Sequence, residues 1–180
     1  MYFGASRLAA RTDELGDLVV LEDQDRDRWD AAHLTRAFHH LDFSARGSGV
    51  SRFHLEAGIA AIHAGAVDLR ATDWAGILSL YDELLARFPS PIVALNRAVA
   101  VLHVHGPEAA EAALAPARAD PSLALYAPLH AVAAELASRR GDAARASALL
   151  DRALACPGSE PQKRLLERRR RLVRPTISKS

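Results

Sequence analysis

The sequence has only one cysteine among its 180 residues, Cys156. An intramolecular disulfide is therefore excluded, and a reducing compartment such as the cytoplasm is the expected setting. No apolar run approaches the roughly 20 residues of a membrane-spanning helix. The start, Met1–Ala5, has neither the charge nor the apolar run of a secretory signal. We expect a cytoplasmic protein with no membrane partner.

The sequence also lacks the motifs that would indicate catalysis. It contains no zinc-protease, paired-cysteine or phosphate-binding-loop pattern. The closest histidine pairs, His39-His40 and His103-x-His105, have spacings that do not put two ligands on one helix face. Cys156 has no base nearby in sequence, so we interpret it as structural. We expect no catalysis, no metal and no cofactor.

Alanine and leucine dominate, and aromatic residues make up only 6% of the chain, which favours an all-α fold. The clearest helical signal lies at residues 72–89. Asp73 is placed to cap this helix and Pro89 to end it, and Ser90 and Pro91 then begin another. Its apolar side chains recur at three- and four-residue steps and predict one buried stripe: Trp74, Ile77, Leu78, Tyr81, Leu84, Leu85 and Phe88.

A repeat continues beyond this helix. Predicted helices end at Pro89, Pro121 and Pro157, spaced 32 and 36 residues apart, and others end at Gly106 and Gly141, spaced 35. Alternating marks about 34 residues apart are typical of tetratricopeptide repeats. We therefore predict antiparallel helix pairs stacked as a short right-handed solenoid, with Trp74, Tyr81 and Leu85 buried between the first and second pairs. The pairs are 51–68 with 73–88, 91–105 with 107–119, and 123–140 with 142–155.

This repeat divides the chain into predicted segments. Residues 1–50 form an N-terminal helical or irregular segment, 51–157 the three pairs, 158–174 a capping helix and 175–180 a disordered tail. A capping helix at about 161–173 is expected because a stack of repeats needs a polar end. Pro116 and Pro128 interrupt the pattern, and we expect one to shorten its helix and the other to start or kink one.

The acidic segment Glu22–Asp30 imitates the start of a calcium loop, with carboxylates at alternate positions. Arg28 and Leu34, however, stand where such a loop needs glycine and glutamate. We therefore interpret these carboxylates as helix caps and ion-pair partners. Trp29 and the apolar run Leu18–Leu21 flank the charges and need cover, so we predict that the segment docks on the first helix pair.

Several of these motifs occur together in a specific order. They are Leu21-Glu22-Asp23-Gln24-Asp25-Arg26 with Trp29-Asp30, then Ile59-Ala60-Ala61-Ile62-His63-Ala64, then Thr72-Asp73-Trp74, then Ser90-Pro91 and Val93-Ala94-Leu95-Asn96-Arg97-Ala98-Val99-Ala100-Val101. In combination they resemble the C-terminal, tetratricopeptide-like extension of a group of extracytoplasmic-function sigma factors of bacterial RNA polymerase.

The resemblance implies a regulatory role in transcription initiation. Its implied partners are sigma-factor domains, in the same chain or another, and the polymerase core. The two promoter-binding domains should precede this region, and only Met1–Arg11 stands before it, which we interpret as a fragment or a shortened gene product. The chain alone is not expected to direct transcription. The alternative from another class is a stand-alone scaffold that binds a different protein.

A binding surface is expected on the first helix of each pair, which lines the concave side of such stacks. Asn96 and Arg97 lead the candidates, because arginine can hold a carboxylate with two hydrogen bonds. The alternative is that Asn96 braces the neighbouring pair and that Arg97 is only solvated. The full set of candidate protein-binding residues is Arg52, Glu56, His63, Asn96, Arg97 and His130.

The basic C-terminal stretch favours a rival hypothesis. Residues 160–180 hold eight Lys or Arg against two Glu, and such a cluster could contact nucleic-acid phosphates. No aromatic residues interleave for base stacking. We prefer the interpretation that the arginines are the solvated side of a capping helix, whose packed face is predicted to contain Leu165, Leu166, Arg169, Leu172 and Val173. Direct DNA contact through this helix is the less favoured alternative.

Overall fold

A computed structural model describes residues 2–45 and 49–173. Within these ranges the protein is about 75% helical, with eight α-helices and no β-strands, so the all-α prediction is confirmed. Contacts divide the chain into an N-terminal unit, Met1–Pro89, and a C-terminal unit, Ser90–Ser180. The predicted tail, 175–180, lies outside the described residues. None of the helices in the described ranges is both long enough and apolar enough to cross a membrane.

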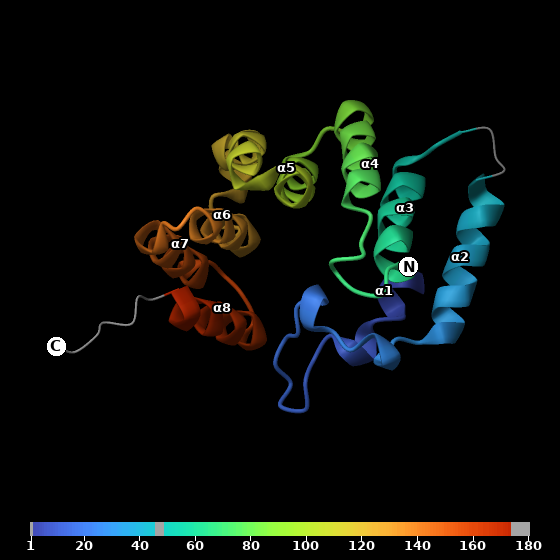
Figure 1. The fold of residues 1–180 in the computed structure, drawn as a ribbon, viewed down its shortest axis with the longest axis horizontal. Coiled ribbons are helices and arrows are strands. Elements are labelled where there is room, and N and C mark those ends of the chain that lie inside the picture. The colour runs from blue at the N-terminus through green and yellow to red at the C-terminus, as the bar shows by residue number, and fades with distance from the viewer. Residues whose placement is uncertain (1, 46–48, 174–180) are drawn as a thin grey trace. The chain divides into compact units, whose positions relative to one another are not determined.

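The N-terminal unit begins with short helical pieces (Figure 1). Helix α1 spans Tyr2–Ala5 and α2 spans Ala31–Ala45, with short 3-10 turns at Leu8–Ala10, Leu21–Asp23 and Arg26–Arg28. The longest helix of this part, α2, starts at Ala31. The reason is Asp30, whose carboxylate accepts a hydrogen bond from the His33 backbone N–H at 2.9 Å and so marks the helix start.

The first predicted helix pair is present in this unit as α3, Arg52–Gly65, and α4, Trp74–Arg87, which pack against each other. Asp73 caps α4 by accepting from the Gly76 backbone N–H at 2.9 Å. Gly58 lies at the contact, because a Cβ there would come within 3.2 Å of a Leu80 methyl group. The close approach of the two helices therefore depends on a missing side chain.

Three members of the stripe predicted on α4 are buried, but they are not the three expected to pack against the second pair. Ile77, Leu78 and Leu84 are at most 8% exposed, whereas Trp74, Tyr81 and Leu85 are only partly buried. Trp74 still finds a polar partner, since its indole N–H donates to the Leu69 carbonyl at 3.1 Å. The prediction that Trp74, Tyr81 and Leu85 are fully buried is therefore wrong. A wide apolar stripe does not by itself indicate which of its edges faces the neighbouring helix.

The acidic segment docks on the first helix pair, as predicted. One guanidinium nitrogen of Arg26 donates to the His63 carbonyl at 2.8 Å and to the Ala66 carbonyl at 2.6 Å. The last carbonyls of a helix have no partner within the helix, so Arg26 satisfies acceptors at the end of α3. Trp29 is 7% exposed beside it. Asp25 caps the short turn after it by accepting from the Asp27 backbone N–H at 3.0 Å, consistent with a capping role for the carboxylates.

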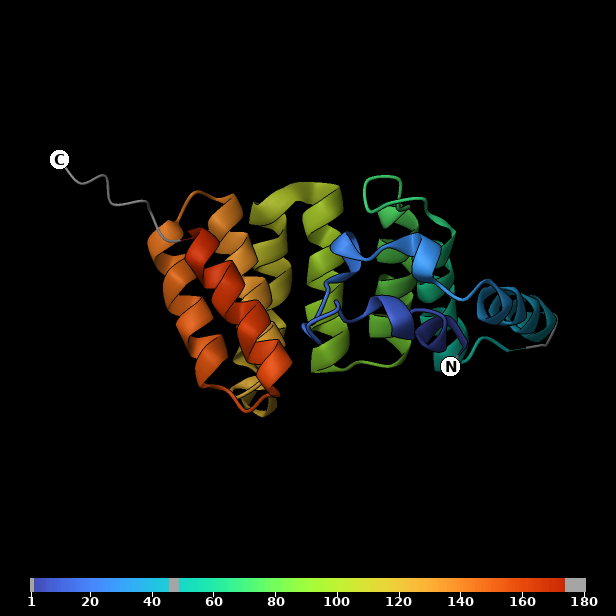
Figure 2. The same cartoon turned by 90° about the horizontal axis from the view of Figure 1, so that it is seen from below.

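The C-terminal unit contains helices α5 to α8 (Figures 1 and 2). Helix α6 contacts both α5 and α7, and α8 packs on α7. A 3-10 turn at Pro121–Leu123 connects α5 to α6. The fully buried large side chains are leucines, with alanines between them. The helix bounds are α5 Pro91–Ala119, α6 Ala127–Arg139, α7 Ala143–Ala155 and α8 Glu160–Val173.

Two glycines produce the predicted helix breaks in this unit. Gly106 has a φ of +86° and interrupts α5, which is thereby two helical segments. Gly141 has a φ of +79° and ends α6, where the Asp142 N–H donates back to the Ala137 carbonyl at 2.9 Å. Both conformations favour residues without a Cβ. Pro128 lies in the first turn of α6, as predicted for one of the two prolines, but Pro116 lies inside α5 without shortening it.

Helix α8 packs on the C-terminal unit through a narrower face than predicted. Leu166 joins a core cluster with Ala134, Leu150 and Ala153, and Val173 packs against it. Leu172 is 86% exposed, so its assignment to the packed face is wrong. The side chains of Arg169 and Arg170 are partly buried, because both form ion pairs with carboxylates of neighbouring helices. A helix rich in arginine can therefore face its own core through ion pairs.

Candidate functional site

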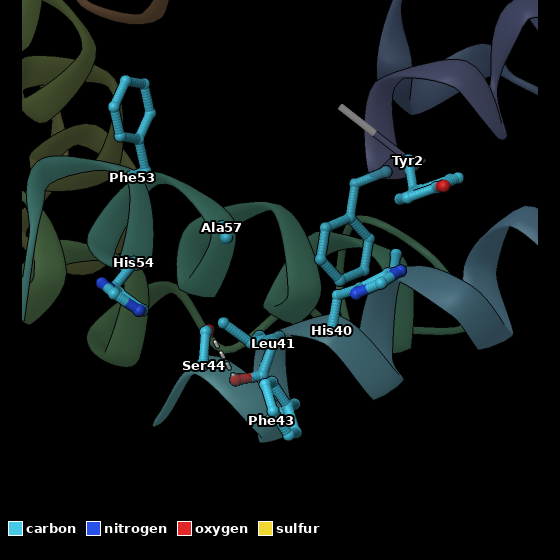
Figure 3. Close-up of a pocket in the computed structure, with 10 residues that line it drawn as sticks. Tyr2, His40, Leu41, Phe43, Ser44, Phe53, His54 and Ala57 are labelled. Carbon is cyan, nitrogen blue, oxygen red and sulfur yellow. Dashed lines mark hydrogen bonds between the residues drawn. The ribbon is translucent and has the colours of Figure 1, made fainter. Parts of the chain in front are cut away.

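The N-terminal unit contains an open groove of about 390 Å³ formed by α1, α2 and α3, which we call the aromatic groove (Figure 3). Its volume falls in the range of sites that hold ligands or partner side chains, about 300–1,000 Å³. None of the described residues that line it is Asp, Glu, Lys or Arg. The lining residues are Tyr2 and Phe3 from α1, Ala37, His40, Leu41, Phe43 and Ser44 from α2, and Phe53, His54 and Ala57 from α3.

Aromatic side chains dominate the groove and are unusually exposed. Phe43 is 70% and Phe53 is 77% exposed. Tyr2 stacks on His40, with ring centroids 5.3 Å apart and planes 7° from parallel. Large exposed apolar side chains gathered at one place mark interaction sites more often than isolated ones do. The groove therefore has the composition of a binding surface.

Two polar side chains of the groove, Ser44 and His54, already have hydrogen-bond partners within the unit. The Ser44 hydroxyl donates to the Leu41 carbonyl at 2.9 Å, the dashed line of Figure 3. The His54 ring nitrogen Nδ1 accepts from the Ser51 backbone N–H at 3.0 Å and lies 2.8 Å from its hydroxyl, so this histidine serves as a helix cap. What the groove offers a partner is apolar contact rather than catalysis or charge.

The predicted binding residues of α3 lie beside this groove rather than in it. Arg52 and Glu56 form an exposed ion pair of 2.7 Å, one helical turn apart. Glu56 and His63 line a second, smaller cavity of the same unit together with Tyr81. Burial, and then the charge of Glu56, raises the pKa of the Tyr81 hydroxyl. All three predicted residues therefore lie on the same helix, α3.

The other predicted residues belong to the C-terminal unit. Asn96 is exposed and Arg97 partly buried on α5. His130 lies on α6, and its ring nitrogen Nε2 is 2.9 Å from the Ala124 carbonyl oxygen. The structure therefore brings Arg52, Glu56 and His63 together in one unit and assigns Asn96, Arg97 and His130 to the other. A single surface formed by all six stays a prediction.

The basic helix α8 is engaged by its own unit. Arg169 lies 2.9 Å from a carboxylate oxygen of Glu135 on α6, and Arg170 lies 2.6 Å from one of Asp151 on α7. Glu135 also accepts from Arg139 at 2.7 Å. Two of the arginines that could have met phosphates are thus paired with carboxylates. These contacts favour the capping interpretation over nucleic-acid binding.

The chemistry-bearing residues elsewhere have structural surroundings. Over residues 2–45 and 49–173, His, Cys, Asp and Glu side chains form no group of three or more able to hold a metal ion. Cys156 is 5% exposed, and its thiol donates to the Arg152 carbonyl at 3.3 Å. Burial raises the pKa of this thiol, which disfavours the reactive thiolate. The structural interpretation of Cys156 agrees with this environment.

Sequence reasoning missed the aromatic groove. Phe43 and Phe53 flank the glycine-rich break between α2 and α3, and residues 1–50 were predicted to be a helical or irregular N-terminal segment. The available signal was the clustering of aromatic residues, since Tyr2, Phe3, Phe38, Phe43 and Phe53 all precede residue 55 in a chain with only ten such residues. Pattern alone could not show that three short helices bring them together.

Comparison with known proteins finds similarity to proteins of unknown function. Residues 1–45 match a family of unknown function, DUF6596, and this segment contributes α1 and α2 to the groove. The chain is also 41% identical over 150 residues to an uncharacterized protein of Rhizobium meliloti (strain 1021). That match covers 83% of this chain and 35% of the relative, so the chain spans about a third of the length of the curated relative it matches. No solved structure matches.

Proposed function

We propose that this chain is the regulatory, protein-binding extension of an extracytoplasmic-function sigma factor of bacterial RNA polymerase. In this proposal it contributes to transcription initiation without binding promoter DNA, and it has no catalytic activity. The ordered motifs from Leu21 to Val101 support the family assignment. The longer Rhizobium meliloti relative supports the idea that such a region belongs to a larger protein.

The observation that carries the binding role is the aromatic groove. Interface cores are enriched in aromatic residues and depleted of charge, as this groove is. An elongated apolar groove accepts the apolar face of a partner helix, anchored by a few side chains. The proposed occupant is a helix of the sigma-factor domains, with Phe43 and Phe53 as the anchors. The partner then buries aromatic surface that the unit leaves open.

We also propose that the helix pairs stack as in tetratricopeptide repeats. The contacts between α3 and α4 and between α6 and α7, together with the break of α5 at Gly106, support this arrangement. Such stacks present their helices to partner proteins as a repeated surface. A stand-alone scaffold would use the same surface, and only the identity of the partner separates that alternative from the sigma-factor proposal.

Binding to the remainder of the relative tests the proposal directly. The partner is the part of the Rhizobium meliloti protein outside the 150-residue match, and binding to the full chain is measured by calorimetry. We expect saturable binding that the double variant Phe43→Ala/Phe53→Ala weakens about tenfold or more, because anchors of this kind contribute over 1 kcal/mol each. The control is Leu15→Ala/Val67→Ala, which removes side chains that are 86% and 79% exposed but lie outside the groove.

Transcription assays separate the alternatives. With core polymerase, this chain alone should not initiate from a promoter, whereas adding it to a sigma protein that lacks its extension should change promoter-specific transcription. Initiation by the chain alone would exclude a purely regulatory role. Binding to neither the sigma domains nor the core, with no effect on transcription, would favour the scaffold.

A further inference from the structure

A second cavity of the N-terminal unit, about 180 Å³ in volume, lies among α1, α3, α4 and the docked acidic segment. We call it the Trp29 cavity. Its apolar walls come from Phe3, Ile59, Ala60 and Ala64. Its volume is well below the roughly 300–1,000 Å³ typical of drug-sized ligands. A ligand there would have a short apolar body rather than a large ring system.

Trp29 contributes its ring to the wall of the cavity and carries a buried indole N–H. The residue is 7% exposed, and its indole N–H has no hydrogen-bond acceptor among the described residues. A buried donor without a partner costs about 1–3 kcal/mol, so few persist in native proteins. The indole nitrogen has less than 1 Å² of accessible surface, so an occupant of the cavity would contact the Trp29 ring rather than this N–H.

Positive charge is concentrated around the same indole. The guanidinium carbons of Arg7 and Arg26 lie 5.7 and 4.8 Å from the Trp29 ring centre. Arg26 is engaged with carbonyls at the end of α3. Arg7 lines the cavity, and no carboxylate of the described residues forms an ion pair with it. Burial, then the charges of Arg11 and Arg26, lowers the pKa of Arg7, which reflects this crowding of cations.

The single carboxylate of the lining does not cancel this charge. Glu56 forms an ion pair of 2.7 Å with Arg52. Burial, and then the charge of Glu56, raises the pKa of the Tyr81 hydroxyl. Tyr81 and His63 add polar groups to that side of the cavity. The Arg7 and Trp29 side of the cavity is therefore the part that lacks a negative partner.

We propose that the Trp29 cavity binds a small organic anion. Its carboxylate or phosphate group accepts hydrogen bonds from the Arg7 guanidinium, and its short apolar body lies against Phe3, Ile59 and the Trp29 ring. Charge-assisted bonds of this kind are about twice as strong as neutral ones, which suits a shallow cavity that offers little apolar area. The inference is independent of the sigma-factor proposal, because it requires neither a protein partner nor polymerase.

The test follows the two indole N–H resonances of the full chain by NMR. Trp74→Phe identifies which of the two signals belongs to Trp29. The probes are butyrate, propyl phosphate and inorganic phosphate, with butyramide as the uncharged analogue of butyrate. We expect millimolar or tighter, saturable binding of butyrate, propyl phosphate or both, with the Trp29 signal moving more than that of Trp74. Whichever of the two binds more tightly identifies the anionic group.

Variants then connect binding to the proposed contacts. Arg7→Gln should weaken binding about tenfold or more, the loss expected for a charged hydrogen bond. Arg36→Gln is the matched control, because it removes an exposed arginine of α2 outside the cavity. Trp29→Phe keeps an aromatic ring beside Arg7 and deletes only the buried N–H, so the affinity measured by calorimetry should change little.

Three results would overturn the proposal. The first is butyramide binding as tightly as butyrate, which would remove the role of charge. The second is equal binding of inorganic phosphate and propyl phosphate, which would remove the role of the apolar walls. The third is the absence of saturable binding by all three anions, or an affinity unchanged by Arg7→Gln in a protein whose spectrum shows it is folded.

Discussion

The two units of this chain are built from different side chains. Nine of the ten aromatic residues precede residue 90, and only Tyr126 follows it. In the C-terminal unit the buried residues are almost all alanine and leucine. Small side chains let helices approach closely, as α6 and α7 do, whereas rings packed on short helices leave open space. Both cavities discussed above lie in the N-terminal unit, and the C-terminal unit has another of about 190 Å³ beside Leu150 and Arg169.

The two units also differ in whether a partly buried charged residue has an ion-pair partner. In the C-terminal unit, Glu111 accepts from Arg118 at 2.7 Å and from Arg145 at 2.8 Å, and the second bond connects α5 to α7. In the N-terminal unit, Arg7 lines a cavity with no carboxylate of the described residues in an ion pair with it. The comparison suggests that the C-terminal unit supplies stability and the N-terminal unit supplies binding. Each of the following predictions tests one side of that division.

The largest expected effect is in the core of the C-terminal unit. Leu150 is 2% exposed and packs in a cluster with Ala134, Ala153 and Leu166. Leu150→Ala should lower the free energy of unfolding by about 2–5 kcal/mol, because it removes buried apolar surface and leaves a cavity. Guanidinium denaturation followed by circular dichroism measures it. Leu172→Ala, at a site 86% exposed, is the control. A cost below about 1 kcal/mol at Leu150 would contradict close packing here.

Much of the helical framework could be predicted from sequence, because its boundaries are local. Asp73 and Asp142 cap their helices through hydrogen bonds of 2.9 Å to backbone N–H groups three residues on, the pattern expected of acidic N-caps. The breaks at Gly106 and Gly141 need positive φ, which glycine alone adopts easily. Such signals depend on a few neighbouring residues, so these helix boundaries can be predicted without knowledge of the tertiary fold.

The candidate site was harder to predict because it depends on contacts distant in sequence. The aromatic groove joins Tyr2 to Phe53 across three helices, and neither residue belongs to a periodic stripe. The buried edge of α4 was misassigned for a related reason, since Leu84 and Leu85 are equivalent in pattern and only packing distinguishes them. Docking of the acidic segment was predictable, because Trp29 beside so many charges needed cover.

The next effect concerns the docked acidic segment of the N-terminal unit. Arg26→Gln removes the hydrogen bonds to the carbonyls of His63 and Ala66. We expect a loss of about 1.5–3 kcal/mol, the range for hydrogen bonds to charged groups. Hydrogen exchange should also become faster in residues 21–30. Arg28→Gln, which changes an exposed arginine of the same segment, should leave both measurements unchanged. Unaltered exchange in Arg26→Gln would show that Trp29 alone holds the segment.

A smaller effect depends on pH and belongs to the C-terminal unit. Burial tends to raise the pKa of Glu135, but Arg139 and Arg169 outweigh it and hold the pKa below its ordinary value of 4.5. Because the folded pKa is the lower one, the stabilisation is present above the unfolded pKa and is lost as the pH falls through the folded pKa. Glu135→Gln should therefore cost about 1 kcal/mol or less at neutral pH.

This pH effect is measured as the difference, or gap, in melting temperature between the wild type and a variant. For Glu135→Gln the gap should close as the pH falls below the ordinary carboxyl pKa. Glu160→Gln removes a carboxylate that is 76% exposed and should show no gap at any pH. A gap for Glu135→Gln that stays constant on acidification would mean that its ion pairs with Arg139 and Arg169 do not contribute to stability.

The smallest expected effect on stability is at the aromatic groove. Phe53 is 77% exposed, so Phe53→Ala removes little buried surface and should change the free energy of unfolding by no more than about 0.5 kcal/mol. Leu55→Ala, two residues away on α3 and 3% exposed, should cost about 2–5 kcal/mol. Both are measured by the same denaturation experiment. A natural sequence gains no stability from a phenylalanine in this position, which is why we attribute Phe53 to binding. If Phe53→Ala were as costly as Leu55→Ala, the groove would be part of the core, and the division of roles between the units would fail.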